Sequence, residues 1–174
     1  MFGSGFDRAE LAALFAGHRG ELYRYAARWT GDPDLAEDVV QEAFVRLAER
    51  PPADRSQVRA WLFRVATTVA IDQQRASRRR LELVRRGADR LPMADPPPDP
   101  AVEAERSETR YRVRAALAGL EERDRTVLLM REQGFSHREI AAAVDTTEKS
   151  VGTMIARALE KLAGRLDLDG RVDR

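Results

Sequence analysis

The 174-residue sequence contains no cysteine and only two histidines, His18 and His137. The absence of cysteine excludes disulfide bonds, thiolate metal ligands and cysteine-based catalysis. Two histidines are too few to build a zinc or iron centre of the usual kind. We therefore expect neither a metal centre nor a bound cofactor.

Long apolar segments are also missing from the sequence. No window approaches the roughly 18 consecutive apolar residues of a membrane-spanning helix. Asp7, Arg8 and Glu10 interrupt the first thirteen residues, so we expect no signal peptide. A composition of 43% hydrophobic and 34% charged residues predicts a soluble globular protein, which we place in the cytoplasm.

Motifs for catalysis are lacking as well. The sequence has no glycine-rich phosphate loop, no cluster of metal ligands and no evident pair of a nucleophile with its base. An enzyme is therefore disfavoured, and a binding protein is the better hypothesis.

Proline is concentrated in one place, with five of the eight prolines lying between Pro92 and Pro100. Such a run forms neither helix nor central strand and predicts an extended linker. Helical periodicity lies on both sides of it, from about Arg8 to Val84 and from about Val102 to Asp167, without strand alternation. We predict an all-α chain of two small helical domains, at residues 6–86 and 107–168, with the Pro-rich linker at 87–106.

Capping residues predict three helices in the first half. Asp7 begins a helix that runs to about Thr30, and Asp32 or Asp34 begins the next, at about 35–48. A third helix should cover about 57–80, where neither glycine nor proline occurs.

Charge is segregated along this half, although the net charge is only +1. The segment from Asp32 to Glu49 contains six acidic residues and one basic residue, Arg46. The segment from Arg75 to Arg90 contains seven arginines and two acidic residues. A basic cluster favours phosphate, and an acidic helix face favours a basic protein surface. The alternative interpretation is that both are solvated faces.

Residues 134–162 have the pattern of a helix-turn-helix. Ser136 and Glu139 are spaced as a capping box, and Asp145, Thr146 and Thr147 interrupt the pattern before a second helix. That helix has one apolar face and one polar face, which suits a helix packed on one side and free to contact DNA on the other. An ordinary helical hairpin is the alternative.

Trp61 and Phe63 lie next to basic residues of the third predicted helix. Aromatic rings beside arginines are typical of sites where single-stranded bases stack. Burial of Trp61 in a core is the alternative interpretation.

Three segments together resemble one known family. Asp34 to Arg50, DLAEDVVQEAFVRLAER, resembles the core-polymerase-binding helix of bacterial sigma factors. RAWLFRVATTVAIDQQRASRRR (59–80) resembles the helix that reads and melts the −10 element, and residues 120–162 resemble the −35-binding helix-turn-helix. Their order and spacing resemble the extracytoplasmic-function group of the sigma-70 family, over about residues 6–166.

The resemblance implies a transcription initiation factor that binds the β′ and β subunits of core RNA polymerase and promoter DNA. It also implies an anti-sigma factor as partner, no catalysis of its own, no membrane insertion, and association with the nucleoid when bound to polymerase. The implied polymerase-binding residues are Asp34, Asp38, Gln41, Glu42 and Val45. The implied −10 contacts are Trp61, Arg64, Thr68, Arg75, Arg78, Arg79 and Arg80. The implied −35 contacts are Ser136, His137, Arg138, Thr147, Lys149, Ser150, Thr153 and Arg157.

Three departures from the family pattern stand out. Thr67-Thr68 replaces a common Arg-Asn, so Thr68 lacks the amide that could read a flipped base. Gly152-Thr153-Met154 replaces a common Lys-Ser-Arg, and Asp145 replaces the usual turn glycine. Asp tolerates the left-handed conformation, so we expect the turn to survive. These departures keep open a sigma-like decoy that binds an anti-sigma factor without DNA, and an ordinary helix-turn-helix repressor as a third hypothesis.

Overall fold

The structure is a computed structural model that describes residues 5–85 and 101–169. Within these ranges the chain forms seven α-helices and one short 3-10 helix and contains no strand, which confirms the all-α prediction. The elements are α1 (Arg8–Thr30), α2 (Pro33–Glu49), η1 (Arg55–Gln57), α3 (Val58–Arg85), α4 (Ala101–Ala118), α5 (Glu122–Glu132), α6 (His137–Ala143) and α7 (Glu148–Asp169). The proline run, Arg86 and Arg90 lie outside the described residues.

Capping explains where the first two helices begin. Asp7 caps the start of α1, as predicted, and together with Glu10 it forms a reciprocal capping box. Of the two candidate caps for α2, the structure selects Asp32, whose side chain accepts from the backbone N–H of Asp34. The helix therefore starts at Pro33, because proline suits the first helical position. Gly31, at φ 74°, provides the left-handed residue that ends α1.

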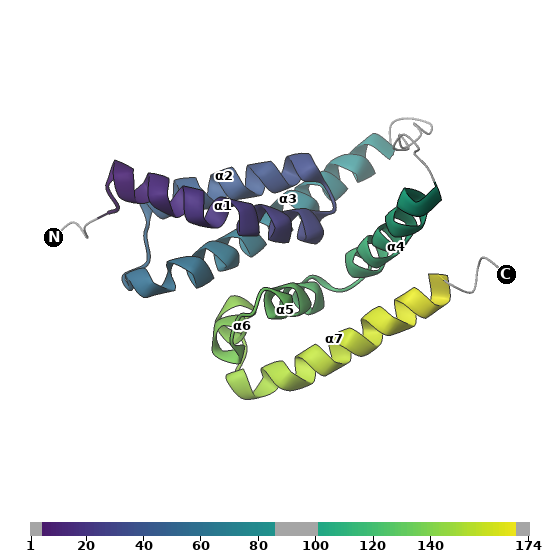
Figure 1. Cartoon of the computed structure of the whole chain (residues 1–174). Helices are drawn as coiled ribbons and strands as arrows, with labels where there is room; N and C mark the ends of the chain where they lie inside the picture. The colour runs from purple at the N-terminus through teal and green to yellow at the C-terminus, as the bar shows by residue number, and fades with distance from the viewer. Residues whose placement is uncertain (1–4, 86–100, 170–174) are drawn as a thin grey trace.

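Helices α1, α2 and α3 pack on one another and form the N-terminal domain (Figure 1). Aromatic and aliphatic side chains of α1 and α3 pack in its core against aliphatic side chains of α2. The fully buried members include Leu22, Tyr25, Trp29, Val39, Val40, Leu47, Leu62 and Phe63.

Helices α4 to α7 form the C-terminal domain, in which α7 packs against α4, α5 and α6. The predicted capping box joins Ser136 to Glu139 at the start of α6. Asp145 lies at φ 51° in the turn before α7, so the left-handed conformation is retained without glycine, as expected. The buried side chains of this core include Val127, Met130, Phe135, Ile140, Val151 and Ala158.

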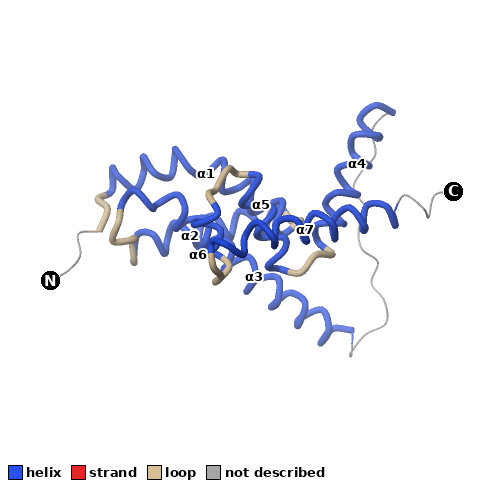
Figure 2. The backbone as a smooth tube through the Cα atoms, turned by 90° about the horizontal axis from the view of Figure 1, so that it is seen from below, coloured by secondary structure: helices blue, strands red, loops and turns tan. Residues whose placement is uncertain are grey.

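The two domains also pack on each other. Helix α5 contacts α1 and α3, α6 contacts α3, and α4 contacts α1 (Figure 2). As a result, buried side chains of both domains join in one continuous hydrophobic cluster. Among the described residues, no helix combines the length and the apolar character needed to cross a membrane.

Candidate polymerase and nucleic-acid interfaces

The acidic helix α2 presents one polar face to solvent. Asp34, Asp38 and Gln41 are exposed, and Glu42 is half-buried and paired with Arg46 at 2.8 Å. Val45 is 51% exposed, an unusual position for a valine on a helix that buries its other face. With residues of α3, four members of this face line a groove: Asp38, Gln41, Glu42 and Val45. The structure thus brings the predicted polymerase-binding residues together on one accessible surface.

The predicted −10 contacts lie along α3, from its first turn toward its C-terminal end. Arg64 and Thr68 are exposed one turn apart, whereas Trp61 is half-buried. The hydroxyl of Thr68 donates to the carbonyl of Arg64 at 3.1 Å, so it is already engaged within its own helix. Arg79 and Arg80 are exposed, and the side chain of Arg78 lies outside the described set.

Arg75, another predicted −10 contact, is paired across the domains. Its guanidinium donates to the Glu122 carboxylate at 2.6 Å and 3.2 Å. The hydrogen bond from Arg75 to Glu122 also raises the pKa of Arg75 above its ordinary value. A DNA phosphate would therefore have to compete with a carboxylate for this side chain.

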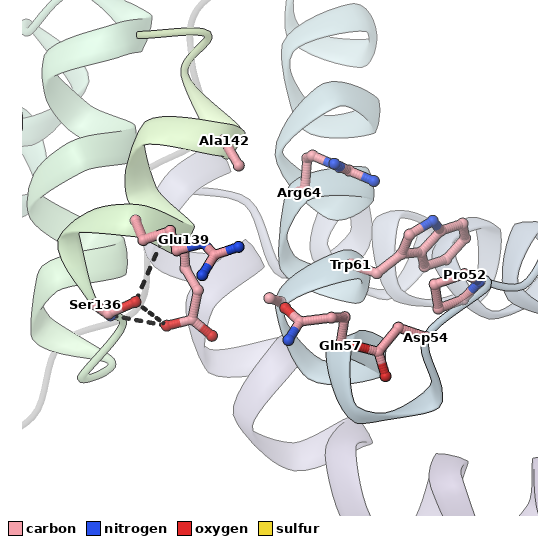
Figure 3. Close-up of a pocket in the computed structure, with 10 residues that line it drawn as sticks. Pro52, Asp54, Gln57, Trp61, Arg64, Ser136, Glu139 and Ala142 are labelled. Atoms are coloured by element: carbon pink, nitrogen blue, oxygen red, sulfur yellow. Dashed lines mark hydrogen bonds between the residues drawn. The ribbon is translucent and has the colours of Figure 1, made fainter. Parts of the chain in front are cut away.

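A groove lies between the start of α3 and helix α6 (Figure 3). Trp61 and Arg64 line it from the N-terminal domain, together with Asp54 and Gln57, which the sequence patterns did not single out. Residues of the other domain complete it: Ser136, Arg138, Glu139 and Ala142. Two predicted −35 contacts, Ser136 and Arg138, therefore face the predicted −10 surface.

Most of the remaining predicted −35 contacts lie on α7 or directly before its first residue. Five of them are exposed at helical spacing: Thr147, Lys149, Ser150, Thr153 and Arg157. His137 is half-buried and shares a hollow with Lys149 and Gly152. A Cβ atom added at Gly152 would meet only the His137 ring at 3.9 Å, an ordinary contact, so packing does not require glycine there.

Two cations with the chemistry to bind phosphate are paired within the protein itself. Lys161, on the polar face of α7, donates to Asp124 at 2.6 Å, and this bond raises the pKa of the lysine. Arg59 donates to Glu21 and to the Gln133 carbonyl. Burial tends to raise the pKa of Glu21, but hydrogen bonds from Arg59 and His18 outweigh it and lower the value.

Comparison with known proteins identifies both domains. The profile of Sigma-70 region 2 matches residues 14–80, and that of Sigma-70, region 4 matches residues 110–162. The chain is 32% identical to the ECF RNA polymerase sigma factor SigG of Mycobacterium tuberculosis over 178 residues, covering 89% of this chain and 48% of that protein. It is 46% identical to SigL of the same species over 81 residues, covering 43% and 46% of the two chains. The chain thus spans about half the length of these curated relatives.

Two solved structures are similar over nearly the whole chain. CnrH in complex with the cytosolic domain of CnrY is 28% identical, with a TM-score of 0.63, and the alignment covers 94% of this chain and 91% of that one. The sigma factor RpoE of Bartonella quintana, in complex with the anti-sigma factor NepR, has a TM-score of 0.66 and covers 91% and 97%; at 19% identity it supports the fold alone.

Proposed function

Because the chain belongs to the extracytoplasmic-function group of the sigma-70 family, we propose that it is a transcription initiation factor. It binds core RNA polymerase and directs the enzyme to promoters by reading the −10 and −35 elements. In this role the chain breaks no bond and supplies sequence specificity to an enzyme that makes RNA. The proposed working units are residues 6–86 and 107–168, with 87–106 as the connection.

The observation that carries this proposal is the separation of opposite charges on two helices of one small domain. The acidic face of α2 is exposed beside α3, whose exposed side chains include Arg64, Arg79 and Arg80. A DNA-binding domain alone has no use for an exposed acidic face, since that face repels phosphate. A protein that must hold a basic protein surface and DNA at once needs both.

We propose that the polymerase binds the face formed by Asp34, Asp38, Gln41, Glu42 and Val45. The exposed Val45 supplies an apolar contact at the C-terminal end of this face, and the carboxylates that precede it along α2 select a basic partner. An ordinary helix-turn-helix repressor would not need this surface.

The −10 element is assigned to α3 and the −35 element to the start of α7. Arg64, Arg75 and the arginines at 78–80 would hold phosphates, with Trp61 and Thr68 near the bases. On α7, exposed side chains at helical spacing would enter the major groove, namely Lys149, Ser150, Thr153 and Arg157. Thr147 and the residues at 136–138 would contact the same −35 element beside α7.

An anti-sigma factor is the proposed regulatory partner. Both similar structures hold a protein of this fold in complex with a second protein, and in one of them the second protein is an anti-sigma factor. The overall similarity in fold makes a partner of the same kind reasonable for this chain.

The first test is binding to core polymerase. Asp38→Lys with Glu42→Lys should weaken binding by about tenfold to a hundredfold, or about 1.4–2.8 kcal/mol, because four units of charge change on the docking face. Glu160→Lys with Asp167→Lys, which makes the same charge change on exposed residues of α7, should leave the affinity unaltered. Affinity measured by fluorescence titration with purified core enzyme decides the docking assignment.

Run-off transcription with the same proteins tests the rest of the proposal. Purified core polymerase with a genomic fragment library should give new transcript starts, preceded by two shared motifs, only when the chain is present. Tight binding to core enzyme without new starts would contradict promoter reading. If the chain neither binds core enzyme nor gives new transcript starts, the result would favour a decoy that binds only an anti-sigma factor.

A further inference from the structure

The first turn of α6 has a fixed position beside the start of α7. The two helices pack on each other next to the turn that joins them (Figure 1). The capping box between Ser136 and Glu139 makes His137 the first helical residue of α6. Phe135 and Ile140 are fully buried on either side of it along the chain and hold this turn in the core. The backbone of His137 is therefore fixed relative to α7.

The side chain of His137 lies against α7 and is half-buried. Its neighbour Arg138 instead lines the groove between the domains. The hollow that contains the imidazole is completed by four residues before and within the first turns of α7: Thr147, Glu148, Lys149 and Gly152. None of the residues that the structure describes forms a hydrogen bond or an ion pair with the His137 ring. Its nitrogen atoms are therefore available to a ligand.

Gly152 leaves a gap in the polar face of α7. It is exposed, between Lys149 one turn before it and Thr153 directly after it. A Cβ atom built at position 152 would lie 3.9 Å from Cε1 of the His137 ring. The imidazole thus lies beside the space that a side chain at 152 would occupy.

The backbone at Gly152 does not require glycine. Its φ angle is not positive, and the added Cβ would make only an ordinary contact. Glycine within a helix is destabilising relative to alanine, and a common use for it is the close approach of a ligand to the backbone. An exposed glycine on the proposed DNA-binding face has this property.

Other polar groups near the gap are already paired with neighbours. The hydroxyls of Thr147 and Ser150 share a hydrogen bond at 2.8 Å. The hydroxyl of Ser136 donates to the Glu139 carboxylate at 2.7 Å and accepts the backbone N–H of that residue. The His137 ring has no such partner among the described residues, so it is the side chain of α6 best placed to contact DNA beside Gly152.

We propose that His137, presented through the gap at Gly152, reads one base pair of the −35 element in place of a side chain from α7. This role rests on the proposed function and adds a base preference to it. A neutral imidazole has one N–H donor, and the major-groove edges of adenine and guanine both present N7 as an acceptor. His137 therefore selects a purine at one position, next to the base pairs that Lys149 and Thr153 contact.

A long side chain at 152 would prevent this contact. It would cover the edge of the His137 ring and reach the groove first, because its Cβ would already touch the imidazole. A lysine there would select guanine through O6 and N7. Reading by His137 and reading by a residue at 152 therefore exclude each other.

The first test measures base preference with the complex of core polymerase and the full chain. Promoter duplexes found by run-off transcription are randomised in the −35 element, and the bound fraction is sequenced. Wild type should prefer a purine at one position, and His137→Ala should reduce that preference by about fivefold or more while the rest of the motif is kept. Arg131→Ala, an exposed change on α5, should keep the whole motif. Circular dichroism should show the same helicity for all three chains.

Gly152→Lys provides a second test, because the new lysine should cover the ring. This variant should narrow the preference at the same position to guanine. Adding His137→Ala to it should then leave the motif unchanged, although His137→Ala alters the wild-type motif. Equal effects of His137→Ala in both backgrounds would overturn the proposal.

Uniform weakening of all −35 sequences by His137→Ala would also overturn it, since a ring that holds a phosphate or supports α6 does not distinguish bases. In both cases the wild-type motif would still support the proposed function. A wild-type complex that shows no −35 motif at all would contradict promoter reading itself, and with it the role of His137.

Discussion

At the scale of single residues, short polar side chains decide where helices begin. Asp7, Asp32 and Ser136 each accept a backbone N–H that the helix itself leaves unpaired. These contacts were predictable from sequence, because a cap and its partner lie within three positions of each other. The choice of Asp32 over Asp34 as the cap of α2 was not predictable from sequence, because both side chains can cap a helix. The proline between them fixes the start of α2, since proline suits the first helical position.

The capping box of α6 predicts a pH-dependent contribution to stability. The hydrogen bond from Ser136 lowers the pKa of Glu139 below its ordinary value of 4.5, despite partial burial. The stabilisation is therefore fully present above about pH 4.5 and disappears as the pH falls through the lowered folded value. Glu139→Ala should cost about 0.3–1.5 kcal/mol at neutral pH.

Glu139→Gln is the matched control, because glutamine completes a capping box but does not titrate. Urea unfolding at several pH values should show a smaller decrease in stability on acidification for this variant than for wild type. Identical pH profiles for the two proteins would mean that the Glu139 carboxylate contributes nothing to the cap.

At the scale of elements, periodicity and charge predicted most helices and their polar faces, but not which distant side chains those faces contact. The boundaries of α1 and α2 agree with the sequence to within two residues, and α3 extends five residues beyond the predicted end at Arg80. Residues 101–106, placed in the linker by composition, begin α4. Helical spacing puts Lys161 on the polar face of α7, but its partner Asp124 lies 37 positions away, a separation that no helical pattern reveals.

The basic end of α3 predicts a salt-dependent contact with DNA. Replacing Arg78, Arg79 and Arg80 with alanine should weaken promoter binding by the polymerase complex for all sequences alike. The slope of log K against log salt should fall by about 0.7–0.9 for each phosphate that is no longer neutralised, because fewer counterions are released. Filter binding across a salt series measures this slope.

Three exposed arginines outside α3 offer a control with the same change in net charge: Arg8, Arg24 and Arg50. Their replacement should leave the slope at the wild-type value. A slope that changes equally in both triple variants would assign the effect to net charge and not to contacts made by α3.

At the scale of the whole molecule, the contact between the domains could not be predicted from the sequence. Trp29 and Thr126 are 97 positions apart, and Arg125 in a charged segment has the pattern of a solvated residue. Its burial depends on the shape that two separately folded domains present to each other. Periodicity and charge predicted two domains and three binding surfaces, whereas the closed arrangement follows only from their packing.

The shared core predicts how the chain unfolds. While the two domains are packed together, neither can unfold without exposing apolar surface of the other, so urea should unfold the wild type in one transition. The fluorescence of Trp29, isolated by Trp61→Phe, should then follow the same curve as helicity. In Arg125→Met, which lacks the donor to the Trp29 carbonyl, the domains should unfold separately, and Trp29 should report only the N-terminal transition. If Arg125→Met and the wild type both gave one coincident transition, the contact between Arg125 and Trp29 would contribute no coupling between the domains.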